Sequence, residues 1–342
     1  MISDLAVQKN YVHELLGEKQ IDAKEFVCVL DQGRVAHSSG LVITSENRVL
    51  EGVSCVNFNT DLPSNPLHLR YLPKPSRVSG SAVFLTCQMP YNYCHWILEA
   101  LPRLGVYASA GISAVCVYAP TEKNFQKETL RLLGFPTSKI IRATRNGHVL
   151  FDRLAVSASR PHCNSHSIDF LYNSFASHHE VSQPKKMRVF ISRRKRGKRV
   201  IMNEYEVLKE LQPLGFKQFD LEAMSVSEQI KLFNNAECVV GPHGAGLTNI
   251  AFCQEGTKVI EINTPYRTSP CFYDIAYYRG LNYLLHVAQP ETKSFFSFDS
   301  KTGVGDSDMK VQPEAFAKIV RSFLQDPSSA DQSYAFKKNL PV

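Results

Sequence analysis

Short apolar stretches alternate with amphipathic segments in the second half of the chain. The first predicted strand leads to a helix capped by Asn203, and the capping box Ser225-Val226-Ser227-Glu228 opens a second helix. Strands and helices that alternate in this order predict a parallel sheet covered by helices on both faces. The predicted strands are residues 188–192, 216–219, 238–240 and 258–262.

The first half shows a different pattern. Residues 25–55 contain short β-rich stretches separated by turn signals, which predicts a small N-terminal antiparallel β element. Residues 92–107 have apolar positions at helical spacing, and Pro102 is expected to kink or end this helix near Leu101. The other predicted elements are strands at 81–86, 115–119 and 154–157 and a helix at 122–133.

These elements predict an α/β protein of two domains, for which 342 residues are sufficient. We expect an N-terminal domain over residues 1–183 and a C-terminal domain over residues 184–311. The last amphipathic helix lies within residues 312–342, and we expect this segment to join the N-terminal domain. The segment before it, 293–311, is rich in Ser, Gly and Asp and is predicted to be a loop.

Composition narrows the class of protein. Hydrophobic residues make up 44% of the chain and charged residues 21%, which is typical of a globular protein. The nine cysteines form no C-x-x-C pair and several lie in apolar runs, which indicates buried thiols in a reducing compartment. Polar residues interrupt the N-terminal segment and no long apolar run occurs, so we expect neither a signal peptide nor a membrane span. These observations favour a cytoplasmic protein.

The net charge of +7 comes from one segment. Residues 185–200 contain nine Lys and Arg residues and no acid, which exceeds the charge of the whole chain. Such a cluster is compatible with a nucleic-acid-binding module. However, Arg193 and Arg194 follow a predicted strand, where open α/β sheets bind ligands, which favours a smaller anion. Lys195 to Arg199 are expected to form a solvated loop.

A glycine-rich turn joins two apolar stretches and reads Gly241-Pro242-His243-Gly244-Ala245-Gly246-Leu247-Thr248-Asn249. Glycines allow a backbone to approach an anion, and the start of the next helix presents amides and the positive end of a dipole. A histidine in the turn can add a hydrogen bond or a charge. The turn therefore predicts a diphosphate-binding site.

Three segments in this order resemble glycosyltransferase family 61, whose defining domain was formerly known as DUF563. They are Asn92-Tyr93-Cys94-His95-Trp96-Ile97-Leu98-Glu99 with Leu101-Pro102-Arg103-Leu104, then Ile191-Ser192-Arg193-Arg194, and then the glycine-rich turn. The resemblance covers about residues 25 to 265. The family pattern has an aromatic or larger residue before His95, whereas this chain has Cys94. This departure affects the expected local packing and not the resemblance.

The resemblance implies a GT-B architecture, in which two Rossmann-like domains face each other across a cleft and the C-terminal one holds the donor. It also implies an inverting transfer of a hexose or pentose from a nucleotide sugar, usually a UDP-sugar, with no required metal or cofactor. The expected acceptor is a glycan or glycolipid in polysaccharide assembly, with peripheral membrane association and oligomeric state left open. A nucleotide-sugar-binding protein without catalytic activity is the alternative.

The donor site is predicted from residues around the turn. Arg193 and Arg194 can clamp a diphosphate, and the backbone amides of Gly244, Ala245, Gly246 and Leu247 can bind its other side. His243 is predicted to contact the diphosphate. Glu261 resembles an acid that holds ribose hydroxyls, and a surface ion pair is the alternative. Thr248 and Asn249, in the first turn of the helix, either touch the ligand or cap the helix.

His95 and Glu99 are four residues apart and share one helix face, where the acid can orient the imidazole. This pair is predicted to be the catalytic base or an acceptor site. The alternative is a histidine buried in a helix contact beside Trp96. Arg103 either reaches the cleft or caps the kinked helix.

Other patterns carry less weight. Asp306-Ser307-Asp308 imitates a metal-binding D-x-D motif but lies in a late Gly/Ser-rich segment, and no metal site is predicted. His162, His166, His178 and His179 lack the accompanying ligands of a metal site. The turn also lacks the third glycine of a dinucleotide fingerprint, which argues against an oxidoreductase.

Overall fold

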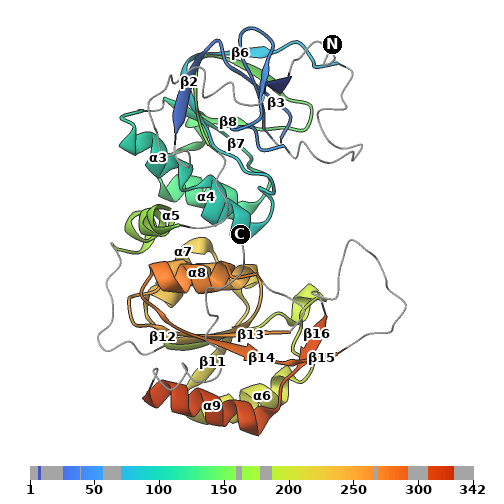
Figure 1. Cartoon of the computed structure of the whole chain (residues 1–342), viewed down its shortest axis with the longest axis vertical. Coiled ribbons are helices and arrows are strands. Elements are labelled where there is room, and N and C mark those ends of the chain that lie inside the picture. The colour runs from blue at the N-terminus through green and yellow to red at the C-terminus, as the bar shows by residue number, and fades with distance from the viewer. Residues whose placement is uncertain are drawn as a thin grey trace. The chain divides into compact units, whose positions relative to one another are not determined.

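The computed structural model of the chain divides into two compact units, Met1–Leu171 and Tyr172–Val342 (Figure 1). None of the helices among the described residues is long and apolar enough to cross a bilayer. The structure describes residues 7–8, 26–38, 40–56, 71–113, 115–158, 164–177, 187–264, 269–291 and 307–326.

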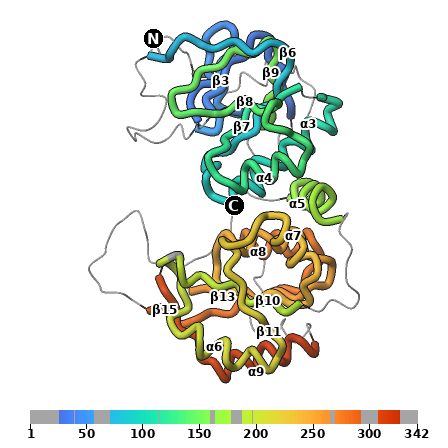
Figure 2. Tube along the Cα trace, turned by 180° about the vertical axis from the view of Figure 1, so that it is seen from behind, coloured from blue at the N-terminus to red at the C-terminus, as the bar shows by residue number. Residues whose placement is uncertain are grey.

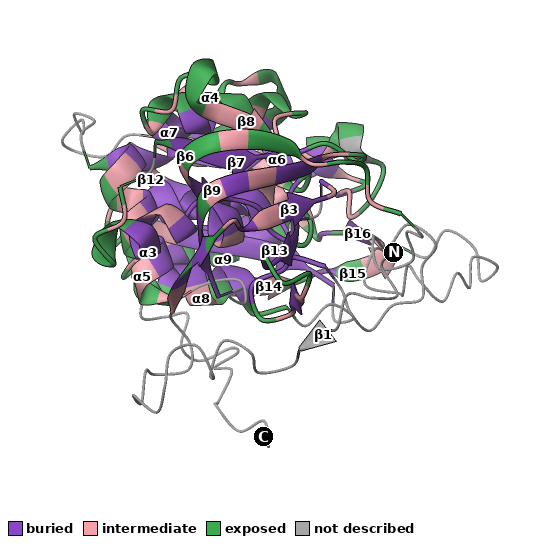
Figure 3. Ribbon diagram, turned by 90° about the horizontal axis from the view of Figure 1, so that it is seen from above, coloured by how far each residue is buried: buried purple, intermediate pink, exposed green. Residues whose placement is uncertain are grey.

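The second unit contains a five-stranded sheet in which every strand pair is parallel. The strand order is β11-β10-β12-β13-β14, which is the 2-1-3-4-5 order of a doubly wound sheet. β12 and β13 are buried along almost their whole length (Figure 3), as expected of strands covered on both faces. The bounds are β10 Met187–Ile191, β11 Phe216–Phe219, β12 Ala236–Pro242, β13 Lys258–Asn263 and β14 Asn282–Val287.

Helices cover both faces of this sheet. Figure 1 shows α7 and α8 on one face and α6 and α9 on the other. Ser225 caps α7 in the predicted capping box with Glu228, and Gly215 ends the segment after α6 with φ of 81°. The predicted alternation of strands and helices is thus confirmed. The bounds are α6 Glu204–Leu211, η7 Gln212–Leu214, η8 Leu221–Ala223, α7 Val226–Asn234, η9 Ala245–Phe252, α8 Cys271–Tyr278 and α9 Pro313–Gln325.

The described part of the C-terminal helix differs from its predicted place. We expected residues 312–342 to join the N-terminal domain, but α9 packs with α6 in the core of the second unit. Phe316, Val320 and Phe323 are almost completely buried there. The unit boundary also lies earlier, between Leu171 and Tyr172 rather than near residue 183.

A short segment before α9 closes onto the loop before α6. Asp308 is buried and accepts the N–H of Val200 at 2.9 Å, and Asn203 exchanges two hydrogen bonds with Val311. Asp308 therefore has a structural role. A small sheet also joins β15 (Gln289–Glu291) to β16 (Asp308–Lys310). β16 lies within residues 293–311, which were predicted to be a loop, and residues 293–306 of that segment lie outside the described residues.

The first unit is built on a mixed nine-stranded sheet. Its strands β8-β7-β6-β9 are parallel and follow the 3-2-1-4 order of a Rossmann-like sheet. β6 and β9 lie side by side although they are far apart in the sequence (Figure 2). The predicted N-terminal antiparallel element forms part of this sheet through β3, β4 and β5. The bounds are β1 Val7–Gln8, β2 Val27–Asp31, β3 Arg34–Ala36, β4 Leu41–Ile43, β5 Val49–Leu50, β6 Ser76–Phe84, β7 Cys116–Ala119, β8 Ile140–Arg142 and β9 His148–Ser157.

A widened helical turn precedes Pro102. The N–H of Leu101 donates to the carbonyl of Trp96, five residues earlier, at 3.1 Å. Proline clashes with the carbonyl four residues before it, and this π-type turn relieves the clash, so the predicted kink is confirmed. The indole of Trp96 donates to Thr129 and fixes the segment to α4. The bounds are α2 Tyr93–His95, η3 Trp96–Ala100, α3 Arg103–Ser109, α4 Asn124–Leu132, η4 Thr137–Lys139 and α5 Ser165–Leu171, with η5 Tyr172–Ala176 in the second unit.

We expect the protein to lose stability in acid because of His286. Its ring packs against Phe316 with centroids 4.6 Å apart, and burial lowers the pKa of His286 to about 4. In the unfolded chain its pKa is near 6.5, so between these values the unfolded state binds more protons and stability falls as the pH falls. The loss reaches about 3 kcal/mol near pH 4.

Urea unfolding of the wild type and of His286→Leu at several pH values between 7 and 4 tests this expectation. The variant should show a weaker decline than the wild type over this interval. Parallel pH profiles of the two proteins would contradict it.

Candidate functional site

The loops that follow β10 and β12 meet at the point where the strand order reverses. β10 and β12 are neighbours in the sheet, and the chain runs outward from this pair in both directions. In doubly wound sheets the carboxyl ends of the strands form a crevice at such a switch point, which is where ligands bind. Arg193 follows β10, and His243 and Gly244 follow β12. The fold thus brings two of the predicted binding segments together.

The guanidinium group of Arg193 lies directly against the backbone of Gly244. A Cβ atom at Gly244 would be 1.8 Å from Nη1 of Arg193, so only glycine leaves room for this group. The backbone of Gly244 is extended, with φ of 160° and ψ of 173°, so the requirement for glycine comes from space rather than from conformation. The positive charge of Arg193 therefore lies beside the predicted anion-binding turn.

The other two glycines of the turn make room for apolar side chains. A Cβ atom at Gly241 would lie 2.9 Å from Cβ of Ile191, and one at Gly246 would lie 3.1 Å from Leu221. Both glycines therefore let the turn pack tightly on its own unit. The sequence pattern of three glycines did not distinguish these packing roles from approach to an anion.

Backbone amides at the start of η9 lie next to Arg193 in the turn that follows β12. The N–H of Leu247 donates to the carbonyl of Gly244 at 2.9 Å, so it belongs to the helix and not to a ligand. The amides of Ala245 and Gly246 precede this bond and have no acceptor within the helix. Both residues are half-buried, whereas Gly244 is buried. The turn therefore offers fewer amides than the four predicted.

His243 is oriented by a buried carboxylate. Its Nδ1 lies 2.5 Å from Oε1 of Glu261, and both side chains are almost completely buried. A carboxylate only accepts hydrogen bonds, so Nδ1 carries the proton. The ring of Phe272 on α8 packs edge-on against the imidazole, with centroids 4.9 Å apart. The histidine is thus held on two sides.

Glu261 has other partners that the sequence did not indicate. The hydroxyl of Tyr283 on β14 donates to Oε2 at 2.5 Å, and the amide of Asn263 donates to Oε1 at 3.2 Å. Burial, reinforced by the charge of Glu261, raises the pKa of Tyr283, so this hydroxyl stays a donor. Both carboxylate oxygens therefore have protein partners. This geometry favours support of His243 over the predicted contact with a ribose, and the surface ion pair does not occur.

Thr248 and Asn249 lie inside the second unit. Neither side chain is exposed, and the amide of Asn249 donates to Gln229 on α7 and to the carbonyl of Gly246. Asn249 thereby joins η9 to α7. The structure thus supports packing roles for both residues, in place of the predicted contact with the ligand.

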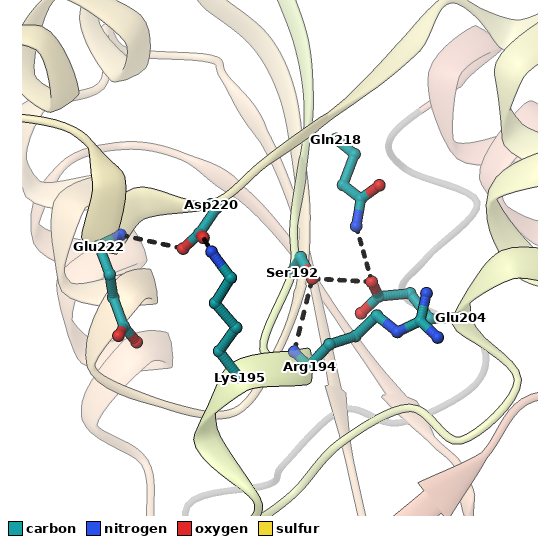
Figure 4. Close-up of polar contacts among 7 residues, drawn as sticks. All are labelled: Ser192, Arg194, Lys195, Glu204, Gln218, Asp220 and Glu222. Atoms are coloured by element: carbon teal, nitrogen blue, oxygen red, sulfur yellow. Dashed lines mark hydrogen bonds and ion pairs between the residues drawn. The ribbon is translucent and has the colours of Figure 1, made fainter.

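The basic segment is partly neutralised by acids from other parts of the unit. Arg188 forms two hydrogen bonds with Glu237, and Lys195 pairs with Asp220 (Figure 4). Arg194 is exposed, and its side chain extends beside Glu204. Lys185 and Lys186 lie outside the described residues, as do His162, His178, His179 and Asp306. The described part of the cluster is therefore not a continuous positive face.

The first unit contains a second histidine–carboxylate pair. Nδ1 of His95 lies 2.6 Å from Oε1 of Glu99, and both side chains are largely buried. Asn92 caps the helix by accepting the N–H of Cys94 at 3.0 Å. The acid fixes the tautomer, so Nε2 is the nitrogen that can accept a proton. The predicted pair therefore forms within one helical segment.

Arg103 is a core residue next to this pair. Its guanidinium donates to the carbonyl of Ser157, at the end of β9, and to Sγ of Cys55, and it lies over the ring of Phe84. Arg103 thus ties the helix to the ends of β6 and β9, neither reaching solvent nor capping the kink. Burial raises the pKa of Cys55 and Cys87, so both stay neutral thiols.

Comparison with known proteins agrees with these features. The family model described as Glycosyltransferase 61 matches residues 93–260. The matched range begins at α2 and ends in β13, and it includes His95, Glu99, Arg193 and His243.

Individual relatives match shorter parts of the chain. An EGF domain-specific O-linked N-acetylglucosamine transferase from Gallus gallus is 30% identical over 127 residues, which is 33% of this chain and 24% of the relative. A beta-1,2-xylosyltransferase from Arabidopsis thaliana is 36% identical over 69 residues, which is 20% of this chain and 13% of the relative. The chain thus matches a quarter or less of the length of these relatives. The predicted resemblance is confirmed over this range: residues 93–260 match the model of glycosyltransferase family 61.

Proposed function

We propose that the protein transfers a sugar from a UDP-sugar to a carbohydrate acceptor, with inversion and without a metal ion. The observation that carries the proposal is the contact between Arg193 and Gly244 at the switch point of the second sheet. This contact places a permanent positive charge beside helix-start amides, which is the arrangement that a diphosphate leaving group requires.

In this reaction the acceptor oxygen attacks the anomeric carbon while the bond from that carbon to the diphosphate oxygen breaks. The electron pair of the broken bond goes to the diphosphate. Arg193 and the amides of Ala245 and Gly246 stabilise the added charge, and His243 contributes a further contact. Each donor of this kind contributes about 3 to 4 kcal/mol to stabilising the transition state. Among the described residues, no group of His, Cys, Asp or Glu is suited to hold a metal ion.

The proton of the acceptor hydroxyl needs a base, and we assign it to Nε2 of His95. Glu99 orients the imidazole and stabilises the imidazolium that forms. The proposal thus gives donor binding to the second unit and proton transfer to the first. The two-domain GT-B architecture and the cytoplasmic location are part of the same proposal.

The names of the two relatives suggest the donors to test first. One transfers N-acetylglucosamine and the other xylose. The purified chain should bind UDP, and it should release UDP from at least one of UDP-N-acetylglucosamine, UDP-xylose and UDP-glucose when oligosaccharide acceptors are added. EDTA should leave both results unchanged.

The outcomes separate the hypotheses. Absence of binding to UDP and to every UDP-sugar would refute the proposal. Binding without release of UDP, with any acceptor, would instead support a nucleotide-sugar-binding protein without catalytic activity. Activity that disappears in EDTA and returns with a divalent ion would refute the metal-free mechanism.

A further inference from the structure

Glu204 is a buried carboxylate at the same edge of the second sheet as the proposed donor site, and it takes no part in that site. It is the first residue of α6 and only 1% exposed. An acid at a helix start interacts favourably with the dipole, but this interaction is available to an exposed side chain as well. The burial of Glu204 is therefore explained by its hydrogen-bond partners.

One oxygen of Glu204 joins the ends of two neighbouring strands. Oε1 accepts the hydroxyl of Ser192, after β10, at 2.7 Å, and the side-chain amide of Gln218, on β11, at 2.8 Å (Figure 4). The N–H of Ser192 also donates to the carbonyl of Phe219, which continues the strand pairing past the end of β10. Glu204 thus holds the position at which the chain leaves β10.

The chain that leaves β10 carries Arg193. Arg193 follows Ser192 directly in the chain, so the hydrogen bond between Ser192 and Glu204 also constrains the backbone of Arg193. On the far side of the loop, Lys195 pairs with Asp220, which also accepts the N–H of Glu222 (Figure 4). The loop is therefore anchored before and after Arg193 and Arg194, and the side chain of Arg193 projects from between these anchors to Gly244.

The carboxylate of Glu204 also lies close to Arg194. Burial raises the pKa of Glu204, and the Ser192 hydrogen bond and the positive charge of Arg194 act in the opposite direction. Oε2 is buried and has no hydrogen-bond partner within the described part of the chain. Burying a carboxylate costs free energy unless the charge is paired. Glu204 lies beside a loop that contains arginines and no acid.

We infer that Glu204 is a positioning residue for donor binding, which holds Ser192 and the backbone of Arg193 so that the guanidinium group lies at the diphosphate site. The inference rests on the proposed function. It assigns a role in donor affinity to a residue that does not touch the donor.

Titration calorimetry with UDP on the full chain tests the inference. Glu204→Ala should weaken UDP binding about 10- to 100-fold, and Glu204→Gln, whose amide oxygen can still accept both hydrogen bonds, about fivefold at most. In turnover assays the change should appear in the KM for the donor more than in kcat. Glu237→Ala is the matched control, because it removes a paired carboxylate at the opposite end of the same sheet.

A double-mutant cycle separates positioning from general stability. In an Arg193→Ala background, Glu204→Ala should cause little further loss of UDP affinity, because the group that it positions is absent. If Glu204→Ala does not fold, Ser192→Ala gives the same test, with an expected loss of about tenfold.

The results distinguish this inference from the proposed function. If the wild type binds no UDP, both the proposed function and the inference are refuted. If the wild type binds UDP and the folded Glu204 and Ser192 variants bind it equally tightly, only the inference is refuted. The same holds if their losses of UDP affinity add fully to the loss caused by Arg193→Ala.

Discussion

Asparagine in place of His95 is expected to lower kcat about 10²- to 10⁴-fold, the usual contribution of a general base. The asparagine amide can still donate to Glu99, as Nδ1 of the histidine does over 2.6 Å. It lacks a nitrogen that accepts a proton. The variant should therefore fold and bind UDP with wild-type affinity while turnover is lost, which steady-state kinetics and calorimetry can measure together.

The matched control is His148→Asn. Nδ1 of His148 lies 2.7 Å from the carbonyl of Pro73, so the asparagine can keep this hydrogen bond too, in the same unit but away from the pair. This control should retain kcat. If His95→Asn were as active as His148→Asn, proton transfer would have to be assigned to another group.

The second large effect is expected from Gly244→Ala, which should lower kcat/KM about 10²- to 10³-fold. The added methyl group would occupy the position of the Arg193 guanidinium, since the two would lie 1.8 Å apart. The variant therefore keeps the arginine but displaces its charge from the diphosphate. UDP binding by calorimetry and kcat/KM for the donor are the measurements.

The substitution has an internal test. In an Arg193→Ala background the space beside the turn is vacant, so Gly244→Ala should then have little further effect. Two controls apply the same chemical changes elsewhere. Gly52→Ala adds a methyl group whose nearest neighbour is 4.0 Å away, and Arg188→Ala removes the arginine at the other end of β10. A Gly244→Ala variant with normal affinity would show that the guanidinium does not serve the donor from this position.

Local chemistry made much of the fold predictable. The Ser225 capping box, the glycine at 215 and the kink at Pro102 each follow from contacts within a few residues, and the structure contains all three. The location of α9 depends on a distant surface instead. Its amphipathic pattern shows that one face is buried but not which sheet receives that face, so its assignment to the first domain was wrong.

The same distinction applies to the candidate site. Strand ends and a glycine turn are visible in the sequence, and they located Arg193 and His243 correctly at one edge of the sheet. The partners of Glu261 were not visible, because Tyr283 belongs to a strand that was not predicted. Glu204 was overlooked for a similar reason, since only the fold brings Ser192 and Gln218 to its carboxylate.

The bonds that Asp308 and Val311 make to Val200 and Asn203 have a consequence for biosynthesis. These contacts join positions 108 residues apart, and they hold the base of the loop that carries Arg193. A ribosome must therefore have released about a hundred further residues before that loop can take its final shape. Until then a nascent chain can form its early strands, but the loop that carries Arg193 is not yet held at its base.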